Sequence, residues 1–241
     1  MDNTSGSLLI AIPIYGMVSN IFFQAYTKFI YEIDSINVPV SILIQTGDSL
    51  VNRQRNAMAK QFLTQTDCSA FLQIDSDLAF TAQNVQHIWE DLQKVDVVCG
   101  LYPKKTDKTI DWVINTLPYK PENRSDSLVE IMYAGTGFLA MNKVVLESIK
   151  EKFKEEIEYQ NDVNGSLEWD FFRVGVVDFG DKKRFLSEDW GLCYLARECG
   201  YKVYADTRII LRHDGSIVYP TDRQIKESGY LKVVDLYSEN K

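Results

Sequence analysis

Two carboxylates lie two residues apart in the segment Asp75, Ser76 and Asp77, directly after the apolar run Ala70–Ile74. Side by side at the end of a strand they would repel each other, and each pKa would be raised unless a cation lay between them. A hard divalent cation with oxygen ligands removes that repulsion. The segment therefore favours a metal site, although a solvated acidic turn would have the same sequence.

His213 is the second candidate ligand, and it follows a short apolar segment late in the chain. Alone, such a histidine is better explained as a satisfied polar residue than as a ligand. Together with the acidic segment, it favours a mixed carboxylate and imidazole site. That donor set suits Mn²⁺ or Mg²⁺, and Mn²⁺ accepts the nitrogen ligand better.

Three polar residues, Arg53, Asn56 and Lys60, are spaced i, i+3 and i+7. They share one face of an expected helix over residues 50–63, beginning in its first turn. Cations at a helix start oppose the dipole but attract phosphate. The pattern indicates either a phosphate-binding face or a solvated basic face.

Glu188 and Asp189 follow Ser187 at the start of a second clear helix, over residues 187–199. Acidic residues in a first turn stabilise a helix by about 0.3–1 kcal/mol each, which is one explanation for them. The functional explanation is a general base held at the helix start.

Gly135, Thr136 and Gly137 separate two apolar segments. Glycines there allow a close approach of the backbone to a ligand, although a plain turn would explain them equally well. The Gly-Lys-Ser/Thr ending of a phosphate loop does not follow.

Alternating strands and helices must position these residues. Continuous apolar runs and amphipathic segments predict a βαβαβαβ order, hence a mostly parallel sheet with helices on both faces. Ligands bind at the carboxyl ends of such strands, where residues 13–16, 46–49 and 75–77 all fall. The expected strands are 8–14, 38–45, 70–74 and 95–99, with helices over 21–33, 50–63 and 81–94 between them.

The second half of the chain is less regular. Strands are expected at 128–132, 138–141, 203–205 and 209–211, a helix at 143–154, and a long connection over 155–184. Trp169, Phe171 and Phe172 fall in that connection, where they would either line an acceptor site or belong to the core.

Composition limits the function classes. A chain of 241 residues with 45% hydrophobic and 25% charged residues suits one α/β domain. Its net charge of −8 argues against a nucleic-acid partner. No apolar run approaches the roughly 20 residues of a membrane span, and the N-terminus lacks the basic region of a secretory signal. The four cysteines, expected to be reduced, make a cytoplasmic location the default.

Taken together, these segments resemble the GT-A glycosyltransferases, and also the glycosyltransferase domains of large algal DNA viruses. The resemblance covers residues 8–215 and predicts a GT-A (Rossmann-like) domain over 1–215, with an extension over 216–241. It rests on IPIY at residues 12–15, FLQIDSD at 71–77, GTGF at 135–138, SEDWGL at 187–192 and ARECGYKV at 196–203.

The resemblance implies roles for the matching residues. Asp77 and His213 would bind Mn²⁺ or Mg²⁺ bridging the donor diphosphate, and Asp75 would contact the ribose or the metal through water. Asp189 would be the base of an inverting enzyme. The base and ribose would be held by Pro13, Ile14, Tyr15 and Asp48, and the donor sugar would face Gly135, Thr136 and Gly137. The second strand ends in Gln-Thr-Gly-Asp rather than the usual acidic pair, which leaves the choice of base open.

The expected reaction moves a hexose or deoxyhexose from a nucleoside diphosphate sugar, UDP-linked, to a glycan acceptor by single displacement. Arg53 could add to the charge stabilisation at the leaving diphosphate, and a retaining outcome stays open. Two alternatives remain. A sugar nucleotidyltransferase would want a glycine-rich basic loop after the first strand. A noncatalytic sugar- or nucleotide-binding module would not need both acidic segments.

Overall fold

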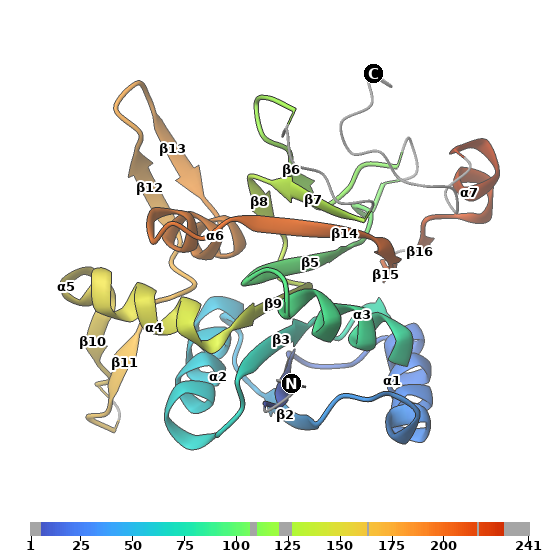
Figure 1. Cartoon of the computed structure of the whole chain (residues 1–241), viewed down its shortest axis with the longest axis horizontal. Helices are drawn as coiled ribbons and strands as arrows, with labels where there is room; N and C mark the ends of the chain where they lie inside the picture. The colour runs from blue at the N-terminus through green and yellow to red at the C-terminus, as the bar shows by residue number, and fades with distance from the viewer. Residues whose placement is uncertain (1–5, 107–109, 121–126, 163, 216, 229–241) are drawn as a thin grey trace.

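A seven-stranded sheet forms the centre of the computed structural model, which describes residues 6–106, 110–120, 127–162, 164–215 and 217–228 (Figure 1). The strand order is β2-β1-β3-β9-β5-β14-β7. Strands β9 and β7 run antiparallel to their neighbours, and the other strands share one direction. The predicted α/β class with a mostly parallel sheet is therefore confirmed. The strands are β1 (Leu8–Ile14), β2 (Val40–Thr46), β3 (Ala70–Ile74), β5 (Val97–Leu101), β7 (Leu128–Ile131), β9 (Phe138–Asn142) and β14 (Val203–Ile210).

Helices cover both faces of this sheet (Figure 1). In β1, Leu9 and Ala11 belong to one core cluster and Ile10 and Ile12 to the other. A strand buried on both faces needs apolar residues at every position, which explains the continuous apolar run. One face packs against α2 (Val51–Gln65), α4 (Lys143–Lys152) and α6 (Glu188–Glu198), and the other against α1 (Asn20–Glu32) and α3 (Ala82–Leu92).

The first half follows the predicted alternation, with boundaries within two residues of those expected. The spatial order differs from a simple parallel sheet, because β9 lies antiparallel between β3 and β5. A strand from the second half thus completes the sheet of the first half. The apolar pattern of a buried strand carries no information about which strands flank it.

The stretch 155–184, expected to be a long connection, contains two β-hairpins. Their strands are only three or four residues long, which is too short for a clear alternating pattern. Trp169, Phe171 and Phe172 are buried in the core beneath α2 and α4, so they belong to the core. The two strands expected over 203–211 are one strand, β14, with a register shift after Asp206. The elements of this stretch that were not expected from the sequence are α5 (Lys154–Ile157), β10 (Glu158–Gln160), β11 (Leu167–Trp169), β12 (Gly175–Asp178) and β13 (Lys183–Leu186).

Besides the two hairpins, the described residues form two further small sheets. The first pairs β15 (Arg212–Asp214) with both β4 (Leu78–Ala79) and β16 (Val218–Tyr219), and the second pairs β6 (Ile114–Asn115) with β8 (Tyr133–Ala134). A last helix, α7 (Asp222–Ser228), follows. Residues 216 and 229–241 of the predicted extension lie outside the described residues, and its boundary stays a prediction.

Within the described part of the chain, no helix combines the length and apolar character needed to cross a bilayer. All four cysteines are free thiols: Cys68, Cys99 and Cys193 are buried, and Cys199 is partly buried. Burial raises the pKa of the Cys193 thiol to about 12, which keeps it protonated and unreactive.

Candidate functional site

The carboxyl ends of β1, β2 and β3 surround a pocket of about 290 Å³. Parallel strands end together, so the turns that follow them meet at this edge. The pocket also includes one residue from the start of α6, Glu188. Six residues predicted from the sequence line it, namely Pro13, Tyr15, Asp48, Asp75, Ser76 and Asp77, together with Ser49, Val51, Gln54, Arg55 and Glu188.

The acidic turn after β3 is fixed by backbone hydrogen bonds on three sides. Asp75 N donates to Gly137 O at 2.9 Å, and Leu78 N donates to Asp75 O at 3.2 Å. Ser19 N, at the start of α1, donates to Ser76 O at 3.0 Å. Since the backbone is held, the two carboxylates project from a rigid turn.

His213 meets Asp77 because β15 pairs with β4, the short strand that follows the acidic turn. Asp214 N donates to Asp77 O at 2.8 Å, and His213 Nε2 lies 3.4 Å from Asp77 Oδ2. His213 Nδ1 lies 2.9 Å from Pro103 O. A carbonyl only accepts, so Nδ1 carries a proton, and Nε2 is the ring nitrogen that faces the Asp77 carboxylate.

A cation would suit this arrangement. Asp77 Oδ1 is buried without a hydrogen-bond partner among the described residues. Burial favours the neutral carboxyl, but the contacts with His213 and Lys105 outweigh it and lower the pKa of Asp77. Lys105 Nζ lies 2.7 Å from Asp77 Oδ2 and is partly exposed, so it can move away.

The donor set fits a divalent ion only in part. Within the described ranges, no three His, Cys, Asp or Glu side chains are grouped closely enough to hold a metal by themselves. Asp77 and His213 supply an oxygen and a nitrogen ligand, and the Nδ1 hydrogen bond orients the ring as in metal-bound histidines. Mn²⁺ and Mg²⁺ often complete their coordination with phosphate oxygens and water. The residues therefore fit a metal that is shared with a phosphate ligand.

Arg55 is the buried cation of the pocket, and the sequence interpretation missed it. Its guanidinium is 3% exposed and lies 2.6 Å from Asp75 Oδ1 and 2.8 Å from Glu188 Oε1. Burial opposes its charge, but the two carboxylates outweigh burial and raise its pKa. A signal was present, because Arg55 shares a helix face with Ala59 and Phe62, and a charge within an apolar stripe requires a partner.

The three residues of the predicted phosphate face point to other partners. Arg53 pairs with Asp48 at 2.7 Å, which lowers the pKa of Asp48. Asn56 holds Asp170 at 2.8 Å, and Lys60 lies 2.7 Å from Ser166 Oγ. None of the three lines the pocket at Asp75–Asp77, although Arg53 reaches its edge through Asp48.

The segment of Gly135, Thr136 and Gly137 packs against Tyr102. A Cβ at Gly135 would lie 2.3 Å from Tyr102 Oη, and one at Gly137 would lie 2.7 Å from it. The Gly137 amide donates to the same hydroxyl at 3.0 Å. The glycines thus accommodate a buried tyrosine, and Gly137 O anchors the acidic turn. Like Ile14, these residues do not line the pocket.

Asp189 lies next to Glu188, in the first turn of α6. Its Oδ1 accepts hydrogen bonds from Ser187 Oγ and from Trp190 N, the latter at 2.8 Å. Burial raises its pKa against the effect of these bonds. Asp189 is outside the lining of the pocket but borders it through Glu188.

Neither a family model nor a curated protein matches the sequence. Solved structures do share its fold. A197 from STIV is similar with a TM-score of 0.55 and 19% identity, over 87% of this chain and 86% of A197. GalNAc-T7, in a structure with UDP, GalNAc and Mn²⁺, is similar with a TM-score of 0.54 and 9% identity. That match covers 88% of this chain and 44% of GalNAc-T7, so this chain spans less than half of it.

These similarities define the fold as the GT-A fold, which confirms the class that the sequence resemblance indicated. At 19% and 9% identity they support the fold alone. The roles of individual residues therefore rest on the geometry of this pocket.

Proposed function

We propose that this chain is a metal-dependent glycosyltransferase that moves a hexose or deoxyhexose from a nucleoside diphosphate sugar to a glycan acceptor, with inversion. The observation that carries the proposal is the pairing of Asp77 with His213 at the ligand edge of a GT-A sheet, where the buried Asp77 Oδ1 has no hydrogen-bond partner among the described residues. The Mn²⁺ and UDP in the GalNAc-T7 structure support a divalent metal and a UDP-linked donor.

Asp77 and His213 would hold Mn²⁺ or Mg²⁺ together with the donor diphosphate. When bound, the ion neutralises the charge that grows on the leaving diphosphate. Arg55 would also stabilise the charge on the leaving diphosphate, because it is a buried, fixed cation beside Asp75. Tyr15 is exposed at the edge of the pocket beside Pro13 and can pack on the base, and Asp48 is available to the ribose.

Asp189 would accept the proton of the acceptor hydroxyl. Its hydrogen bonds to Ser187 and Trp190 fix the orientation of the carboxylate. A raised pKa makes an ionised carboxylate a stronger base, and general base catalysis contributes roughly 10²–10⁴-fold.

Calorimetry with UDP, in the presence and absence of Mn²⁺, tests the proposal. We expect UDP to bind the wild type well only with Mn²⁺, and Asp77→Ala to lose that metal-dependent binding while keeping the wild-type circular dichroism spectrum. His213→Ala should show a milder loss, because water can replace one ligand. Equal UDP binding with and without Mn²⁺, or unchanged binding by Asp77→Ala, would remove the basis of the proposal.

A further inference from the structure

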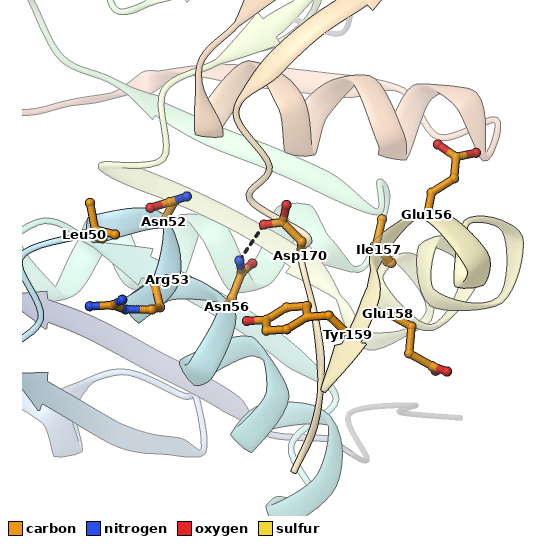
Figure 2. Close-up of a pocket in the computed structure, with 9 residues that line it drawn as sticks. All are labelled: Leu50, Asn52, Arg53, Asn56, Glu156, Ile157, Glu158, Tyr159 and Asp170. Carbon is orange, nitrogen blue, oxygen red and sulfur yellow. Dashed lines mark hydrogen bonds between the residues drawn. The ribbon is translucent and has the colours of Figure 1, made fainter. Parts of the chain in front are cut away.

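A second pocket, of about 430 Å³, lies on the other side of the first turns of α2 (Figure 2). This volume is within the range of about 300–1,000 Å³ that is usual for small-molecule sites. The pocket is bounded by α2 on one side and by the end of α5 and the start of β10 on the other. Its lining consists of Leu50, Asn52, Arg53, Asn56, Glu156, Ile157, Glu158, Tyr159 and Asp170.

Its side chains are of the types that bind sugars. Tyr159 is 38% exposed, and its ring points from β10 toward α2 (Figure 2). Its hydroxyl donates to Glu168 Oε2 at 2.9 Å, which fixes the ring. An aromatic ring held in this way offers a flat apolar surface to a pyranose. Asn52, Asp170 and Arg53 add planar polar groups, which can bond pairs of neighbouring hydroxyls.

Asp170 is held in place for such a contact. The buried Asn56 donates to Asp170 Oδ1 at 2.8 Å, and Asn56 Oδ1 accepts from Phe172 N at 2.9 Å. The second carboxylate oxygen of Asp170 takes no hydrogen bond from the part of the chain that the structure describes. Asn56 thus orients Asp170 and leaves one oxygen to accept a hydroxyl.

Charge disfavours a phosphate ligand in this pocket. Glu156, Glu158 and Asp170 are acidic lining residues, of which Glu156 pairs with Arg173 at 3.4 Å, and the basic lining residue Arg53 is already paired with Asp48. A nucleotide would meet net negative charge there. A neutral polyhydroxy ligand fits the polar lining better.

A salt bridge joins the linings of the two pockets. Arg53 lines the second pocket, and its partner Asp48 lines the first. The segment from Asp170 to Arg173 leads from the second pocket to α6, where Arg173 O would lie 2.2 Å from a Cβ on Gly191. A ligand in the second pocket would therefore lie beside the segment that packs on the helix carrying Glu188 and Asp189.

We propose that the second pocket is a saccharide site, which holds a sugar residue of the acceptor by stacking on Tyr159 and by hydrogen bonding to Asp170. The identification of this sugar as the acceptor rests on the proposed function. Binding of the sugar does not, because neither Tyr159 nor Asp170 lines the pocket at Asp77.

Saturation-transfer NMR tests the pocket directly, with methyl glycosides of glucose, galactose, mannose and N-acetylglucosamine, and with maltotriose, as probes. At least one probe should bind the wild type. Tyr159→Ala and Asp170→Asn should each weaken that binding by about tenfold, because the first removes the stacking contact and the second removes a hydrogen bond to a charged oxygen. Asp170→Asn keeps an oxygen for Asn56, so the pocket wall should survive. Tyr31→Ala, at a 90% exposed tyrosine on α1, is the matched control and should bind like the wild type.

The outcomes separate the two proposals. Sugar binding that depends on Tyr159, without Mn²⁺-dependent UDP binding, would support the saccharide site and contradict the transferase. Failure of every probe to bind the wild type, or equal binding by Tyr159→Ala and the wild type, would overturn the saccharide site. Binding of trilysine that Asp170→Asn abolishes, without any sugar binding, would overturn it in favour of a basic peptide. Melting temperatures of all variants check that they are folded.

Discussion

One carboxylate oxygen of Asp77 is contacted by both Lys105 and His213, and the contact with Lys105 would compete with a bound metal. Lys105 Nζ lies 2.7 Å from Asp77 Oδ2, where His213 Nε2 also approaches. Without a metal, the ammonium pairs with this oxygen, and a bound ion would have to displace it. Lys105 would then be free to reach the diphosphate, which makes it a candidate positioning residue for the donor.

Replacement of Lys105 tests this competition. Lys105→Met should raise Mn²⁺ affinity in the absence of nucleotide by about fivefold, because an opposing cation of roughly 1 kcal/mol is removed. The measurement is Mn²⁺ titration followed by electron paramagnetic resonance. Lys104→Met is the matched control, since Lys104 pairs with Asp111 instead. Unchanged Mn²⁺ affinity in Lys105→Met would contradict the competition.

Asp189→Asn tests the assignment of the base. The amide oxygen can still accept from Trp190 N, but the side chain cannot take a proton. Turnover should fall by about 10²-fold or more, while the UDP dissociation constant stays within a few-fold. Because burial disfavours the charge of Asp189, the neutral amide should not lower the melting temperature. Retained turnover would contradict the assignment of Asp189 as the general base. Loss of UDP binding would instead indicate that Asp189 contacts the donor, and it would favour a retaining mechanism.

The residues of the pocket were predictable to different degrees. Pro13, Asp75 and Asp77 could be found because the end of a buried strand is visible in sequence. Arg55 was missed because Arg53 and Asn56, on the neighbouring face, gave a simpler pattern. The actual partners of those two residues, Asp48 and Asp170, depend on tertiary contacts that helix periodicity does not contain.

At the scale of elements, a buried charge cluster joins α3 to β14. Asp91 and Asp206 are fully buried, and Arg208 bonds both, at 3.0 Å and 2.7 Å. Burial, together with the hydrogen bond and repulsion from Asp206, raises the pKa of Asp91 to about 6. The folded protein therefore holds the proton of Asp91 up to a higher pH than the unfolded chain does.

This cluster predicts a pH dependence of stability. A raised folded-state pKa contributes stability that is complete below the unfolded pKa of about 3.9 and is lost as pH rises through about 6. Asp91→Asn stays neutral, so its melting temperature relative to the wild type should increase between pH 5 and pH 7.5. A gain of about 1 kcal/mol corresponds to about 2–4 °C in a chain of this size.

Differential scanning calorimetry at both pH values measures this gain. Asp34→Asn, at an exposed aspartate, serves as the control and should show no such trend. A melting-temperature difference between Asp91→Asn and the wild type that stays constant with pH would contradict the assigned protonation of Asp91.

The long elements were predictable, and their arrangement was not. Helices α1 and α6 have apolar stripes, and β1 is a continuous apolar run. The pairing of β15 with β4, which brings His213 to Asp77, involves strands of two and three residues. Such strands are stabilised by their surroundings rather than by their own pattern. The sequence therefore indicated His213 as a candidate ligand but did not predict its contact with Asp77.

At the scale of the whole molecule, the fold determines where the two pockets lie. The GT-A fold brings the ends of β1, β2 and β3 to one edge, where the pocket at Asp77 lies. The second pocket opens across α2, beside the segment that leads to α6. Donor and acceptor sites on either side of one helix start would explain why Arg53 pairs with Asp48 at the boundary between them.

The release of nucleoside diphosphate from a panel of nucleotide sugars tests whether this chain is a metal-dependent glycosyltransferase. We predict slow release from at least one UDP-sugar by the wild type with Mn²⁺, loss of release on chelation with EDTA, recovery when Mn²⁺ is restored, and no release by Asp77→Ala. Release of a sugar 1-phosphate would instead indicate nucleotidyl transfer. No release from any nucleotide sugar, or release that continues unchanged in EDTA and in Asp77→Ala, would contradict a metal-dependent glycosyltransferase.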